Sequence, residues 1–122
     1  MFKKVNKNEV RKNKHARIRF TLKGTADRPR LNVYRSTNEI YAQIIDDIKG
    51  ATLCSAASND KALVKALEGK TKVEQAYAVG EAIAKKALKL GVKKVVFDRS
   101  GYIFTGRVKS LAEGAKSAGL DF

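Results

Sequence analysis

Apolar and polar residues alternate along three stretches in the first half of the chain, at residues 30–35, 39–46 and 51–57. Alternation of this kind puts apolar side chains on one face of a half-buried β-strand. Turn-forming residues follow the first stretch at Ser36, Thr37 and Asn38, and the second stretch at Asp47 and Gly50. We therefore expect an antiparallel meander of three strands with one apolar face and one mixed face.

The second half of the chain changes to helical spacing. We predict a short helix ending at residue 67, a longer helix from Thr71 to Gly91, a strand at 93–98 and a final helix at 106–118. Thr71 and Glu74 have the spacing of a capping box, and the small residues of the longer helix are expected to permit close packing onto the sheet. The predicted fold is an α/β two-layer sandwich of βββαβα order, with a mixed sheet, helices on one face and a small extra helix after the third strand.

Residues 1–24 precede this pattern and contain few apolar side chains. A helix there would have only a thin apolar stripe to bury, so we expect a basic N-terminal arm that is partly helical or disordered. Residues 25–122 are expected to form one globular α/β domain, because a chain of 122 residues has room for a single modest core.

Charge is distributed unevenly along the chain. Residues 1–35 hold six Lys and six Arg against Glu9 and Asp27, and so carry +10 of the formal +14. A cationic arm on a nearly balanced body suits a polyanion, first of all a nucleic acid. No apolar run reaches the roughly 18 residues of a membrane span, and the N-terminus is unlike a signal peptide. We therefore expect no membrane partner and a cytoplasmic location, with the single cysteine, Cys54, as a buried strand residue.

The segment 98–108 joins the last predicted strand to the last predicted helix and contains Gly101 and Gly106. A loop of this kind can hold a phosphate, because glycine lets the backbone approach and the first N–H groups of the helix are unpaired. The glycine spacing resembles a P-loop, but Arg107 and Val108 replace its Lys and its hydroxyl residue. A nucleotide triphosphatase is therefore not expected. We also expect no small-molecule substrate.

The same loop carries aromatic and cationic side chains. Tyr102, Ile103 and Phe104 can be explained structurally, as a plug at the end of the core. Arg99 and Arg107 favour a bidentate anion such as phosphate instead.

Candidate catalytic residues are few. The sole histidine, His15, lies in the basic arm with no obvious partner, so an RNA-facing or solvated ring is expected. Asp46, Asp47 and Asp98 fall at predicted strand ends, where a metal-dependent nuclease could gather carboxylates around two ions. Solvated turn aspartates are the ordinary outcome, so we expect no enzyme, no metal site and no cofactor.

Five segments match one known family in order and over nearly the whole chain. They are 28–36 (RPRLNVYRS), 40–47 (IYAQIIDD), 97–102 (FDRSGY), 106–108 (GRV) and 118–122 (AGLDF). In these segments the chain closely resembles the bacterial form of large-subunit ribosomal protein 18. It departs from that family beside two of them, at Glu39 and Thr105, where the family often has histidine. The resemblance implies a structural constituent of the large ribosomal subunit that binds 5S ribosomal RNA. It also implies attachment of that RNA to 23S ribosomal RNA in the central protuberance, beside ribosomal protein 5.

Charge and resemblance predict the same RNA interface. The arm is expected to contact RNA, chiefly by neutralising phosphates, through Lys3, Lys4, Lys7, Arg11, Lys12, Lys14, His15, Arg17 and Arg19. The first hairpin is expected to offer donors, acceptors and a stacking ring through Arg30, Asn32, Arg35, Ser36, Tyr41 and Gln43. The loop is expected to add contacts through Arg99, Ser100, Gly101, Tyr102, Gly106 and Arg107. The alternatives are a nucleic-acid chaperone indifferent to sequence and the metal-dependent nuclease.

Overall fold

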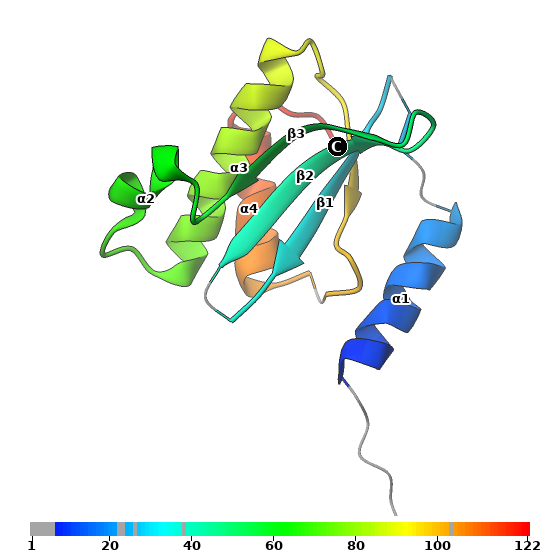
Figure 1. The fold of residues 1–122 in the computed structure, drawn as a ribbon, viewed down its shortest axis with the longest axis horizontal. Helices are drawn as coiled ribbons and strands as arrows, with labels where there is room; N and C mark the ends of the chain where they lie inside the picture. Colours follow the sequence, from blue (N-terminus) through cyan, green and yellow to red (C-terminus); the bar gives the residue numbers. More distant parts are fainter. Residues whose placement is uncertain (1–6, 22–23, 26, 38, 103) are drawn as a thin grey trace, which may run out of the picture.

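The computed structural model describes residues 7–21, 24–25, 27–37, 39–102 and 104–122 (Figure 1). Its elements are, in chain order, α1 (Lys7–Thr21), β1 (Arg30–Arg35), β2 (Ile40–Asp46), β3 (Ala51–Ala57), α2 (Lys61–Leu67), α3 (Lys72–Lys89), β4 (Val96–Asp98) and α4 (Gly106–Ser117). This order confirms the predicted α/β fold. The described part of the arm forms α1, and α2 is the small extra helix.

The four strands form one mixed sheet in the order β3-β2-β1-β4. β1 pairs with β2 and β2 with β3 in antiparallel fashion, as the predicted meander requires, while β4 joins β1 in parallel. β4 is shorter than the strand predicted at 93–98. The reason is a second partner, because the N–H of Val95 donates to the carbonyl of Asp121 at 3.0 Å and Lys94 forms an isolated bridge with Asp121.

Helices α3 and α4 cover one face of the sheet (Figure 1). The core between these layers contains Leu31, Val33, Ile44, Val79, Ile83, Val108 and Leu111, all fully buried. The N-cap of α3 follows the prediction, since the hydroxyl of Thr71 accepts from the backbone N–H of Glu74 at 3.3 Å. The alternation read from the sequence therefore selects the correct buried face of β1 and β2.

Glycine in α3 serves a different contact from the one predicted. A Cβ on Gly80 would lie 2.0 Å from the carbonyl oxygen of Leu111 in α4, and a Cβ on Gly114 would lie 2.2 Å from the carbonyl oxygen of Tyr77 in α3. The two glycines let the helix backbones touch each other. The prediction that small residues bring the longer helix close to the sheet is therefore wrong for Gly80, whose contact is with the neighbouring helix.

Helix α1 lies on the other side of the sheet from α3 and α4, across β1 and β4 (Figure 1). Among the side chains of this helix that the structure describes, four are half-buried and the others are exposed. The four are Arg11, His15, Ile18 and Arg19. Polar contacts thus hold this helix in place more than apolar ones.

Candidate RNA interface

A buried carboxylate, Asp98 at the end of β4, joins α1 to the sheet. Its Oδ2 accepts from His15 Nε2 at 2.9 Å, from Arg30 Nη1 at 2.6 Å and from Asn32 Nδ2 at 3.0 Å. Its Oδ1 accepts from the backbone N–H of Ser100 at 2.9 Å. Burial by itself would raise the pKa of Asp98, but these donors outweigh burial and lower that pKa.

Asp47, in the turn after β2, forms the second centre of the same network. It accepts from Arg30 through Nε and Nη2, both at 3.1 Å, from Arg19 Nη1 at 3.1 Å and from the backbone N–H of Gly24 at 2.7 Å. Burial opposes ionisation here too, yet the hydrogen bonds from Arg30 and Gly24 and the charges of Arg30 and Arg19 lower the pKa of Asp47 to about 2. The two carboxylates in turn raise the pKa of Arg30 against the effect of burial.

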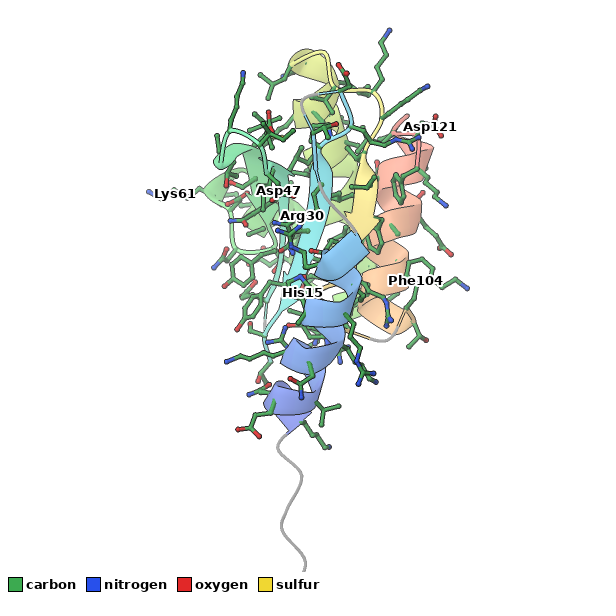
Figure 2. All side chains as sticks on the ribbon, turned by 90° about the vertical axis from the view of Figure 1, so that its right-hand side faces the viewer. His15, Arg30, Asp47, Lys61, Phe104 and Asp121 are labelled. Atoms are coloured by element: carbon green, nitrogen blue, oxygen red, sulfur yellow. The ribbon has the colours of Figure 1, made fainter. Side chains whose placement is uncertain are left out.

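Two expectations about these residues are wrong. His15 has a partner, and Asp47 and Asp98 are not solvated turn residues. Figure 2 shows Asp47, Arg30 and His15 one below another, with His15 on α1. The sequence separation is 83 residues for His15 and Asp98, 17 for Arg30 and Asp47, and 68 for Arg30 and Asp98. Local spacing in the sequence therefore does not indicate these pairs.

The same contacts bear on the nuclease alternative. Asp47 and Asp98 are saturated by cations and N–H donors, and Asp46 is buried and accepts the N–H groups of Ile48 and Lys49 at 3.0 and 3.3 Å. Within the described residues there is no group of three or more His, Cys, Asp or Glu side chains that could hold a metal ion. The three carboxylates are thus structural: Asp47 and Asp98 hold arginine side chains of the protein, and Asp46 holds the backbone of the turn after β2.

The basic side chains of α1 point in two directions. Arg11, His15 and Arg19 are spaced four residues apart and face the body, where Arg11 donates to the carbonyl of Ser100 at 3.2 Å. The exposed set consists of Lys7, Lys12, Lys14 and Arg17. Lys3 and Lys4, also predicted to bind RNA, lie outside the described residues.

In the loop before α4, the first glycine, Gly101, lies directly against the backbone of α1. Gly101 has φ +80°, and a Cβ there would lie 2.2 Å from the carbonyl oxygen of Arg11. The Cβ side of Gly101 is therefore packed against the backbone of α1, and the phosphate contact predicted there is limited to the part of Gly101 that lines the hollow described below. Gly106, the second glycine, has φ +57° and nothing within 4 Å of its Cβ position, and it is exposed at the N-terminus of α4.

The remaining residues of the loop are tied to the protein as well. Tyr102 is buried in the core, as the plug prediction requires, whereas Phe104 is 46% exposed and Ile103 lies outside the described residues. The guanidinium of Arg35 lies 4.9 Å from the centroid of the Tyr102 ring. Arg99 Nη1 donates to the carbonyl of Tyr102 at 2.6 Å, which gives this guanidinium the structural role that the sequence did not suggest.

Arg107 links the loop to the hairpin. Its Nη1 donates to the carbonyl of Ser36 at 3.1 Å, so the start of α4 and the turn between β1 and β2 lie side by side. The guanidinium keeps further N–H groups that this single contact does not use. A hollow bounded by α1, the hairpin turn and this loop brings together Lys7, Arg11, Lys12, Lys14, Arg35, Ser36, Gly101, Tyr102 and Arg107 from the predicted interface.

The uncovered face of β1 and β2 holds the other predicted contacts. Asn32 pairs with Gln43 and Tyr34 with Tyr41 across the two strands, so all four side chains lie on one face. Together with Ser36 they line a hollow of about 580 Å³. Sequence reasoning placed Asn32, Ser36, Tyr41 and Gln43 in the interface but left out Tyr34, which strict alternation along β1 could have added.

The fold and the site together define a basic α/β domain that carries a cationic helix across an otherwise open sheet face. No helix in the described residues is long and apolar enough to cross a membrane. A family model described as "Ribosomal L18 of archaea, bacteria, mitoch. and chloroplast" matches residues 5–122. Two similar proteins named "Large ribosomal subunit protein uL18" come from Bacillus cereus strain AH820, at 57% identity, and Bacillus cytotoxicus, at 58%; both alignments span 122 residues and all of each chain.

The chain belongs to the ribosomal L18 family. Members of this family are structural proteins of the large ribosomal subunit. Family membership therefore confirms both the resemblance and the prediction that the chain is not an enzyme.

Proposed function

We propose that this chain binds 5S ribosomal RNA and helps attach it to 23S ribosomal RNA in the central protuberance of the large subunit. Large-subunit ribosomal protein 5 would be its protein neighbour, and the assembled ribosome in the cytoplasm its location. Family membership supports a ribosomal RNA partner, and the more specific partners are the ones that the sequence resemblance implies.

The division of the basic side chains of α1 into an outward and an inward set is the observation that carries the proposal. Lys7, Lys12, Lys14 and Arg17 are exposed, while Arg11, His15 and Arg19 fasten the helix to the body. A fixed helix holds its outward cations in a constant arrangement, so phosphates can be neutralised with little ordering cost. Base readout would then fall to the open face of β1 and β2.

Titration into labelled 5S RNA, with an unrelated RNA of equal length alongside, tests the proposal across a salt series. We expect preference for 5S RNA at about 0.15 M salt, near physiological ionic strength. Equal affinity for both RNAs that collapses with salt would refute the proposal in favour of the chaperone.

The arm is tested by Lys12→Ala, Lys14→Ala and Arg17→Ala together. Loss of three phosphate contacts makes the negative slope of log K against log salt less steep by about 2 to 3. The control replaces Lys85, Lys89 and Lys109, exposed lysines of the α3 and α4 layer, and removes the same charge. An equal effect of both triple variants would show that net charge alone is responsible.

A further inference from the structure

We propose that the open face of β1 and β2 binds a single unpaired nucleotide, with its base against Tyr34 and Tyr41. The nucleotide site consists of Asn32, Tyr34, Ser36, Tyr41 and Gln43, which line the hollow on this face. This inference rests on the proposed function, because it takes an RNA as the ligand and names the part of the RNA that the face receives.

The two tyrosines provide the stacking surface. Their ring centroids are 5.9 Å apart with the planes tilted by 39°, and Tyr34 is 49% exposed. Aromatic rings exposed on a sheet stack unpaired bases, whereas bases inside an A-form duplex cannot reach such a surface. The hollow of about 580 Å³ is within the range of small-ligand sites. The geometry therefore favours a nucleotide from a loop or bulge over a paired one.

Asn32 adds a direction to the contact. Its Nδ2 donates to Asp98 Oδ2 at 3.0 Å and to Ser100 Oγ at 2.7 Å, which uses both of its N–H groups. An ionised carboxylate only accepts hydrogen bonds, so the amide cannot be reversed without losing its bond to Asp98. The Oδ1 atom therefore points away from Asp98 as an acceptor. A base that presents an amino or imino donor fits this site.

Charge around the nucleotide site suits the attached phosphates. The larger hollow beside α1 shares Tyr34 and Ser36 with the nucleotide site. Its rim carries the cations Lys7, Arg11, Lys12, Lys14, Arg35 and Arg107. None of the described residues that line either hollow is acidic. A nucleotide with its base on the tyrosines thus has cations within reach of the backbone on the side of α1.

Two hairpin RNAs of one sequence test the site, one with a single unpaired uridine in its stem and one with that uridine paired. We expect the full chain to bind the unpaired form about fivefold or more tightly, which corresponds to stacking of one base. Tyr34→Leu with Tyr41→Leu should remove this preference, because leucine keeps apolar area without the aromatic ring. Tyr77→Leu, on the far layer, is the control and should keep the preference.

Photocrosslinking locates the base directly. The unpaired uridine is replaced by 5-iodouridine, and the crosslinked protein is digested with trypsin. Crosslinks in the peptides 31–35 (LNVYR) and 36–49 (STNEIYAQIIDDIK) are expected. Crosslinks confined to α1, or equal affinity for both hairpins, would overturn the site.

The Asn32 contact has its own measurement. An unpaired adenosine is compared with purine riboside, which lacks only the exocyclic amino group. We expect the purine to bind several-fold more weakly, because the Asn32 Oδ1 loses its donor. Equal affinity would remove Asn32 from the site.

These tests separate the site from the proposed function. Preference for 5S RNA together with equal binding of both hairpins would overturn only the nucleotide site. A tyrosine-dependent preference for the unpaired hairpin, with no preference for 5S RNA, would support the site and refute the proposed partner.

Discussion

Replacing Gly101 by alanine should release α1 from the body without disturbing the core. Gly101 has φ +80°, and a Cβ there would lie 2.2 Å from the Arg11 carbonyl oxygen and 3.0 Å from the His15 backbone nitrogen. Both obstacles are backbone atoms, so no side-chain rotation relieves the clash. The loop or the helix must move, and the contacts of Arg11 with Ser100 and His15 with Asp98 are lost with it.

The size of the effect follows from two contributions. A left-handed backbone conformation costs alanine about 1 to 2 kcal/mol. Loss of hydrogen bonds to charged partners adds about 1.5 to 3 kcal/mol for each contact that water does not replace. Since an isolated helix of 15 residues is marginally stable in water, α1 should also fray once it is undocked.

Gly50→Ala is the matched control. Gly50 has φ +66°, but nothing lies within 4 Å of its Cβ position, so this variant carries the backbone cost without a clash. Hydrogen exchange of the α1 amides is the assay, with far-UV circular dichroism as a second measurement. Protection of α1 should fall in Gly101→Ala and stay unchanged in Gly50→Ala. Equal protection in the two variants would refute the docking that we describe.

Three further predictions concern the charged network and the helix layer. Asp98→Asn should lower the free energy of unfolding, measured by urea denaturation, by about 3 kcal/mol, because Arg30 stays buried with one carboxylate fewer. The control Asp121→Asn, at an exposed residue, should change this free energy little. Asp47 has a folded-state pKa of about 2, below its ordinary 3.8, so its contribution to stability is present above about pH 4 and is lost as the pH falls toward 2. The free energy of unfolding of Asp47→Asn should therefore depend less on pH in this window than that of the unchanged chain. An equally steep dependence in the variant would contradict the pairing of Asp47 with Arg30 and Arg19. Gly80→Ala should lower the free energy of unfolding by about 2 to 3 kcal/mol, because the added methyl group pushes α3 away from α4. A decrease under about 0.5 kcal/mol would contradict the close contact between the two helices.

The chain's own pattern determined the strands, the helices and the buried face of the sheet. Leu31 and Val33 alternate with Asn32 and Tyr34, and this period of two is a local property that any strand at these positions would show. The capping sequence at Thr71 likewise acts within one turn of the helix. The charge excess of residues 1–35 is also a property of the sequence alone.

The tertiary structure alone decided which cations face solvent and which face the body. Arg11, His15 and Arg19 read as members of one basic run, yet their partners Ser100, Asp98 and Asp47 are brought to them by the parallel pairing of β4 with β1 and by the turn after β2. A carboxylate and a cation so far apart in sequence leave no periodic signal. The basic helix is a local feature and could be predicted from the sequence. The residues that fasten it could not be, because their contacts join positions far apart in the chain.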